Sequence, residues 1–72
     1  MVNFDMSKMG QRIKELRLES GMSQSELAAK IGVAQNTITQ YEKGTAKASL
    51  EVLVNLAVAL KTTADYLLGL ES

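Results

Sequence analysis

The sequence predicts an all-α domain, a compact five-helix bundle. Apolar residues recur at the three- and four-residue spacing of helices, not in the alternation of strands. Residues that favour helix starts and glycines that favour helix ends lie at the borders of these periodic segments. Only short loops remain between them, so the helices must pack directly on one another. We expect residues 1–72 to form a single domain.

The first helix is expected at residues 6–20. Asp5 or Ser7 is suited to cap its start, and the pattern leaves both alternatives open. Gly21 supplies the stop. One side of this helix has apolar residues at helical spacing, and it is expected to face the core through Met6, Met9, Ile13 and Leu16.

The second helix has strong signals at both ends. Ser23 is a favourable N-cap, and Glu26 three residues later completes a capping box. Gly32 suits the left-handed position at a helix end. The buried stripe between them is formed by Leu27, Ala28 and Ile31. Only Val33 and Ala34 precede the next helix, so the chain must turn sharply there.

The third helix is expected from Gln35 to Lys43, and Gly44 ends it. Ile38 and Tyr41 face inward. The outward side is rich in amides and hydroxyls, whereas a merely solvated side would carry more Lys and Glu; it consists of Gln35, Asn36, Thr39, Gln40 and Lys43. The helix-turn-helix at residues 23–44 is therefore typical of a segment that packs with one side and reads DNA base edges with the other.

Ser49 and Thr63 are expected to cap the last two helices, and Gly69 follows the fifth. The core face of the fourth helix is expected to be Leu50, Leu53, Leu56, Ala57 and Leu60. Val54 and Val58 widen this apolar band. They belong either to a wide core stripe or to a dimer patch formed with Leu67, Leu68 and Leu70.

Nearly the whole chain resembles the helix-turn-helix domain of phage repressor and Cro proteins, the XRE family. The resemblance covers residues 13–21 and 49–69 and the motif itself, through Gln24, Glu26-Leu27-Ala28, Ile31-Gly32-Val33, Thr37-Ile38, Tyr41-Glu42 and Gly44. It implies sequence-specific binding of double-stranded DNA and an Arg17–Glu42 pair with a structural role. The chain departs from the family pattern at Ala34, which lacks a capping hydroxyl, at Ala48 in place of Pro, and at Lys61 in place of Gly.

A primary amide matches the donor and acceptor of adenine in the major groove, so we expect Gln35, Asn36 and Gln40 to contact bases. A·T pairs are expected opposite Gln35 and Gln40, positions that members of the family use for reading. Thr37 and Thr39 stay open between DNA contact and solvated surface. The resemblance assigns Gln24 to a phosphate, at a helix start suited to anions. The remaining candidates for phosphate contacts are Lys43, Thr45 and Lys47.

The composition excludes several other classes of function. The chain has no Cys and no His, which leaves no thiolate metal site and no catalytic constellation, so no enzyme, cofactor or metal is expected. No signal peptide or membrane-spanning segment is evident, which favours a cytoplasmic protein. Residues 1–48 hold seven basic and five acidic residues (+2), and residues 49–72 hold one and three (−2).

The prediction is a homodimeric transcriptional regulator that binds a pseudo-palindromic operator, with repression as the expected direction of regulation. Its length allows either a small Cro-like regulator or the N-terminal part of a longer repressor. The alternative is a protein-interaction module on the same fold, such as an antitoxin or an adaptor. The net charge of zero favours that alternative, because DNA-binding domains are usually basic.

Overall fold

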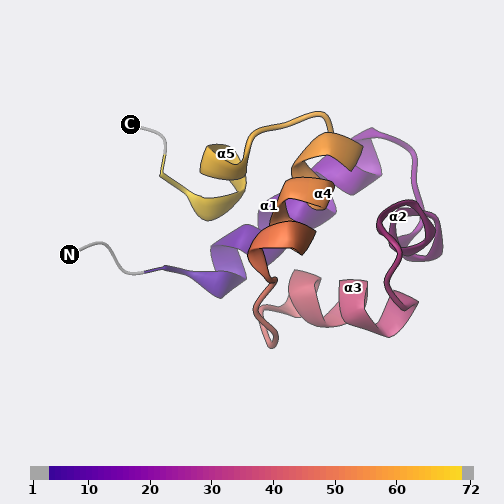
Figure 1. Cartoon of the computed structure of the whole chain (residues 1–72), viewed down its shortest axis with the longest axis horizontal. Helices are drawn as coiled ribbons and strands as arrows, with labels where there is room; N and C mark the ends of the chain where they lie inside the picture. The colour runs from indigo at the N-terminus through magenta and orange to yellow at the C-terminus, as the bar shows by residue number, and fades with distance from the viewer. Residues whose placement is uncertain (1–3, 71–72) are drawn as a thin grey trace.

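A computed structural model of the chain describes residues 4–70. It contains the helices α1 (Met6–Glu19), α2 (Gln24–Ile31), α3 (Gln35–Lys43), α4 (Leu50–Ala59) and α5 (Ala64–Leu68), and no strand within these residues (Figure 1). The predicted all-α class is therefore confirmed. α1 is one residue shorter than expected, because Ser20 caps its end.

Side-chain caps fix where four of the helices begin. Asp5 Oδ1 accepts hydrogen bonds from the backbone N–H groups of Ser7 and Lys8, which decides between the two predicted caps of α1. Ser49 and Thr63 cap α4 and α5 as expected. The complete capping box of α2 joins Ser23 to Glu26 in both directions. Each cap satisfies a backbone N–H that has no partner within its helix.

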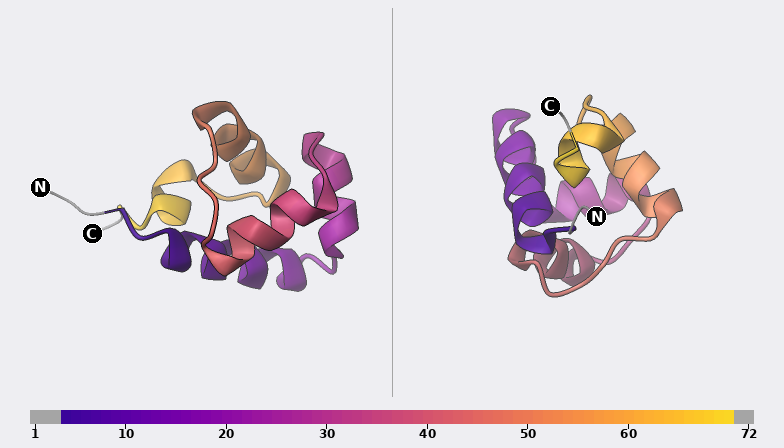
Figure 2. Two further views of the ribbon diagram at one scale, coloured as in Figure 1. Left: turned by 90° about the horizontal axis from the view of Figure 1, so that it is seen from below. Right: turned by 90° about the vertical axis from the view of Figure 1, so that its left-hand side faces the viewer.

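The helices pack around one core to which all five contribute buried side chains. α1 lies along α3 and α5, while α2 packs against α3 and α4 (Figure 2). The buried apolar residues of this core are Met9, Ile13, Leu27, Ala28, Ile38, Tyr41, Leu53, Leu56, Ala57, Leu60 and Leu67. Most of them were predicted from helical spacing, so periodicity alone located the inward sides of α1 to α4.

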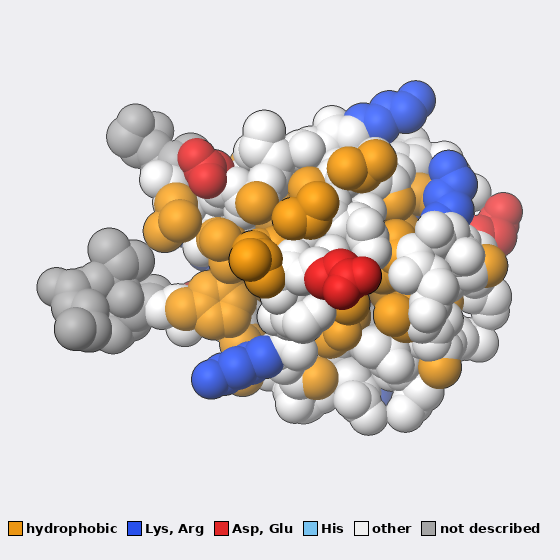
Figure 3. Space-filling model, in the orientation of Figure 1, with side chains coloured by type: hydrophobic (Ala, Val, Ile, Leu, Met, Phe, Trp, Pro, Cys, Tyr) orange, Lys and Arg blue, Asp and Glu red, His pale blue; other side chains and the backbone are white. Residues whose placement is uncertain are grey.

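The exposed side of α4 corrects the prediction for Leu50 and decides against one of the two alternatives for Val54 and Val58. Leu50 was expected in the core but is 77% exposed, and Val54 and Val58 are 49% and 74% exposed. A step of four residues turns 40° beyond one helical turn, so Val54 and Val58 lie further round the helix from the core face held by Leu53 and Leu56 than Leu50 does. The wide core stripe is therefore wrong for the two valines. Figure 3 shows hydrophobic side chains in a row over α4.

The predicted partners of that row divide differently. Leu67 is fully buried and cannot belong to a surface patch, which corrects the prediction for this residue. Leu68 packs partly against the core, and Leu70 is about half exposed. We use the name α4 row for Leu50, Val54 and Val58.

The turn between α4 and α5 has an unusual backbone. Lys61 has a φ of 55°, the only positive φ of a non-glycine residue among the described residues. A side chain in the left-handed region crowds the backbone, which is why glycine is preferred there. The strain expected from Lys61 in place of Gly is therefore present in the structure.

Candidate DNA-binding face

Two glycines, one at the end of α2 and one at the end of α3, set the direction of α3. Gly32 and Gly44 both adopt the left-handed conformation, with φ of 74° and 75°. Ala34 occupies the N-cap position with extended backbone angles but forms no side-chain cap bond, as its methyl group requires. Ile38 and Tyr41 are buried. α3 therefore has its predicted bounds, with its apolar side fixed against the core.

The opposite side of α3 is open to solvent. Gln35, Asn36, Gln40 and Lys43 are exposed there, and we call these four residues the amide face. Within residues 4–70 the structure records no side-chain hydrogen bond for Asn36 or Gln40. Their amides are therefore available to an incoming partner. Gln35 differs, because its Oε1 accepts a hydrogen bond of 3.0 Å from the hydroxyl of Ser25 on α2.

Two residues predicted to contact DNA are joined to each other inside the protein. Gln24 is half-buried and uses both ends of its amide. Its Nε2 donates to Oε1 of Glu42 at 3.0 Å, and its Oε1 accepts from the hydroxyl of Thr39 at 2.9 Å. Thr39 is half-buried as well, and not fully outside as the sequence suggested. In this structure Gln24 and Thr39 thus link α2 to α3.

Glu42 is the centre of this network. Arg17 donates through Nε and Nη2 to the two carboxylate oxygens of Glu42, and through Nη1 to the backbone oxygen of Met22. These bonds join α1, the loop before α2 and the last turn of α3. The structural pairing implied by the resemblance is therefore present in the structure. A two-pronged pair of this kind fixes angle as well as distance.

The other predicted residues lie at both ends of α3. Thr37 is half-buried in the first turn, and Lys47 is exposed in the loop after Gly44. The hydroxyl of Thr45 donates to the backbone oxygen of Gln40, so it closes the end of α3. Lys43, the last residue of the amide face, and Lys47 in the following loop place two positive charges at this end of α3. None of these positions is remote from α3 in the chain.

A close approach of α1 to α3 escaped the sequence analysis. A Cβ atom on Gly10 would lie 2.2 Å from the backbone oxygen of Tyr41 and 2.6 Å from that of Glu42. Only glycine fits between these backbones, so Gly10 lets α1 touch the last turn of α3. The signal available was a glycine in the middle of a helical pattern, which often marks a close contact.

The start of α2 is also fixed electrostatically. The backbone N–H of Ser23 donates to the Glu26 carboxylate, and this bond lowers the pKa of Glu26, with a smaller contribution from the Ser23 side chain. The ionised form is favoured because it accepts the stronger hydrogen bond. This cap holds the turn that carries Gln24 and Ser25.

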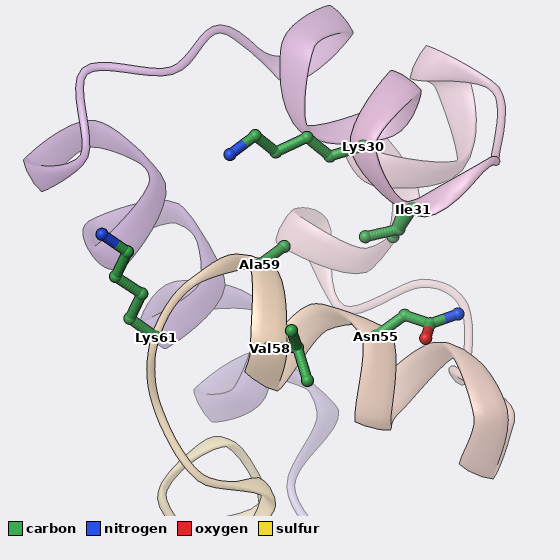
Figure 4. A pocket seen from close by; sticks show the side chains of 6 residues that line it. All are labelled: Lys30, Ile31, Asn55, Val58, Ala59 and Lys61. Atoms are coloured by element: carbon green, nitrogen blue, oxygen red, sulfur yellow. The ribbon is translucent and has the colours of Figure 1, made fainter.

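Other features of the surface do not suggest a competing site. A hollow of about 440 Å³ between α2 and α4 is lined by Lys30, Ile31, Asn55, Val58, Ala59 and Lys61 (Figure 4). It shares no residue with the amide face. Residues 4–70 hold no group of acidic residues arranged to bind a metal. None of the helices in this part of the chain combines the length and the apolar character needed to cross a bilayer.

A polar helix face presented by a helix-turn-helix on a five-helix core is typical of DNA-binding transcription regulators. The chain belongs to the helix-turn-helix family, which matches residues 13–67, and within it to the XRE type. The family consists of DNA-binding transcription regulators and not of enzymes. The resemblance stated from the sequence is therefore confirmed.

Three known proteins illustrate the similarity. The cryptic phage CTXphi transcriptional repressor RstR of Vibrio cholerae is 46% identical over 46 residues, which are 64% of this chain and 41% of RstR. The restriction-modification controller C.AhdI from Aeromonas hydrophila has a TM-score of 0.82 at 36% identity, covering 88% of this chain and 96% of C.AhdI. The P22 c2 repressor in complex with a synthetic operator has a TM-score of 0.82 at 35% identity, covering 83% and 91%. The chain spans about half or less of the length of the curated relatives it matches.

Proposed function

We propose that this chain is a cytoplasmic repressor, which binds operator DNA as a homodimer and thereby represses transcription. The observation that carries the proposal is the amide face: three exposed amides on a helix whose opposite side is anchored by Ile38 and Tyr41. α3 enters the major groove, where each base pair displays a distinct pattern of donors and acceptors. Occupancy of the operator then blocks polymerase. The P22 c2 repressor bound to a synthetic operator, which shares this fold, supports this mode.

The proposed base contacts come from Gln35, Asn36 and Gln40. The absence of arginine from α3 removes the usual partner of guanine, which favours A·T pairs opposite Gln35 and Gln40. Thr37 remains a candidate for a base edge or a phosphate. Thr39 keeps only its methyl group for a thymine while its hydroxyl donates to Gln24.

The proposed phosphate contacts lie on both sides of α3. Lys43 and Lys47 supply the positive charge at one end. Gln24 retains one N–H of its amide beyond the one given to Glu42, so it can serve α3 and a phosphate together. Thr45 is a further candidate for a phosphate contact, in the loop that its hydroxyl joins to the backbone oxygen of Gln40. Such contacts set the register of the protein on the duplex without reading its sequence.

The proposed dimer surface is the α4 row. Its three apolar side chains are between 49% and 77% exposed along one side of α4. A two-fold axis beside this surface would pair two recognition helices with successive major grooves, about 34–36 Å apart. The operator is then pseudo-palindromic.

The same row also supports a second candidate, a protein-interaction module such as an antitoxin or an adaptor. Its exposed leucine and valines, together with the net charge of zero, suit a protein partner. In that case the amide face has no reading role.

Selection from a random pool of double-stranded oligonucleotides tests the two candidates. We expect enriched sites that contain two half-sites one helical turn apart. Each half-site should prefer A·T pairs at two positions, and Gln35→Ala and Gln40→Ala should each abolish the preference at one of them. Gln11→Ala is the matched control, because Gln11 is an exposed glutamine on α1 outside the amide face. Failure to enrich any sequence at low and moderate salt would favour the protein-interaction module.

A further inference from the structure

Gln35 and Ser25 lie on different helices of the motif and share a hydrogen bond. The Ser25 hydroxyl, in the first turn of α2, donates to Oε1 of Gln35 at the start of α3, at 3.0 Å. Both residues are exposed, so the bond has no evident role in the core. We propose that Ser25 is a positioning residue for base recognition, which holds the Gln35 amide in its reading orientation. The proposal rests on the DNA-binding function proposed above.

The hydrogen bond leaves the reading capacity of Gln35 intact. An amide oxygen has two lone pairs and the amide nitrogen carries two N–H groups. Ser25 occupies one lone pair, so the other lone pair and both N–H groups remain for a base. These are the groups that adenine requires, since its N6 donates and its N7 accepts. Ser25 thereby settles which end of the amide faces α2 without removing a contact to DNA.

Fixing the amide matters because Gln35 is long and exposed. A glutamine side chain loses much of its rotamer freedom when it is immobilised. A side chain that is already oriented loses less on binding. When the duplex covers the site and excludes water, the hydroxyl–amide bond also becomes stronger than in the free protein. The resulting gain in affinity concerns the base pair that faces Gln35, so it should appear as stronger discrimination at that pair.

A neighbouring bridge keeps the two helices at the distance this bond needs. Gln24, next to Ser25, accepts from Thr39 one turn after Gln35. The two adjacent residues at the start of α2 therefore each bond to one of two successive turns of α3. Gln40 provides an internal contrast, because the structure records no such bond for its side chain within residues 4–70. Its reading orientation is set only when DNA is present.

Binding profiles of three variants test the inference. The probe is the oligonucleotide selected by the wild-type chain, together with a panel in which each base pair is changed singly, measured by fluorescence anisotropy. Ser25→Ala removes the hydroxyl, whereas Ser25→Thr retains one. Ser20→Ala is the matched control, since it removes the hydroxyl of an exposed serine at the end of α1, outside the helix-turn-helix. A circular dichroism melt of each variant verifies folding.

We expect Ser25→Ala to lower discrimination at the pair facing Gln35 by about three- to tenfold, the value of one neutral hydrogen bond. Discrimination at the pair facing Gln40 should change by less than about twofold, as for independent sites. Ser25→Thr should keep the wild-type profile, and Ser20→Ala should leave it unaltered. An unchanged profile in Ser25→Ala, or an equal loss at every position, overturns the positioning role alone. A wild-type chain without sequence preference overturns the proposed function as well.

Discussion

Arg17 on α1 and Glu42 on α3 form a two-pronged ion pair that is almost closed to water. Nε and Nη2 of Arg17 lie 2.7 and 3.2 Å from the carboxylate oxygens of Glu42, and the two side chains are only 8% and 4% exposed. Each charge has lost most of its hydration and depends on its partner. The pair therefore fixes the angle of α3. Removal of one member leaves the other charge buried without its partner, which lowers the free energy of unfolding.

Arg17→Ala should reduce the free energy of unfolding by about 3–5 kcal/mol, because it leaves the Glu42 carboxylate buried and unpaired. A domain of this size has only a few kcal/mol in total, so much of the variant should be unfolded at 25 °C. Urea denaturation gives the value. Lys14→Ala on the exposed side of α1 is the control and should stay within about 0.5 kcal/mol of wild type. Similar losses in both variants would contradict the structural role.

Ala34→Ser should raise the free energy of unfolding by about 1 kcal/mol. Residue 34 already has the φ of −73° and ψ of 151° of an N-cap, so a serine hydroxyl needs no backbone change to accept a free N–H of α3. The midpoint of urea unfolding should rise while its slope stays constant. Ala29→Ser, inside α2 and exposed, should give no gain. A lower midpoint for Ala34→Ser would contradict the capping argument.

The capping box of α2 should make stability depend on pH in the acid range. The pKa of Glu26 is lowered from 4.5 in the folded chain, so its contribution is complete above 4.5 and is lost as the pH falls through the lower folded value. The difference in melting temperature between wild type and Glu26→Gln should therefore narrow as the pH falls below 4.5. A difference that stays constant across this range would show that the ionised carboxylate is not the stabilising form.

Lys43→Gln and Lys47→Gln should each weaken DNA binding and make the affinity depend less on the salt concentration. If each subunit neutralises about three phosphates, the logarithm of the affinity of a dimer should fall against the logarithm of salt with a slope near −5. Each substitution removes one contact per subunit and should reduce that slope by about 1.8. Lys14→Gln, on α1, should leave it unchanged. Equal slopes in all the variants would remove these lysines from the interface.

Local sequence signals were sufficient to predict most of the fold. α3 runs from Gln35 to Lys43 as predicted, because the two-residue link before it fixes its start and the left-handed Gly44 fixes its end. The prediction for Leu50 was wrong because helical spacing gives a direction around an axis but does not say whether a neighbour covers the first turn. Leu67 was misplaced for the related reason that α5 is too short for a clear periodicity.

The candidate site was predicted less completely than the fold. The exposed positions of Gln35, Asn36 and Gln40 follow from the periodicity of α3. The bonds from Gln24 to Thr39 and from Ser25 to Gln35 do not, because polar side chains choose partners by distances that only the packed helices define. Their roles in DNA binding stay predictions.

The contact at Gly10 has a consequence for how the domain meets DNA. α1 touches the last turn of α3 there without an intervening side chain, and Arg17 secures the same turn from the next part of α1. With its last turn clamped in this way, the helix has little freedom to tilt. Adjustment to an imperfect operator would then fall to the duplex, so flexible base steps that the protein never contacts should influence affinity.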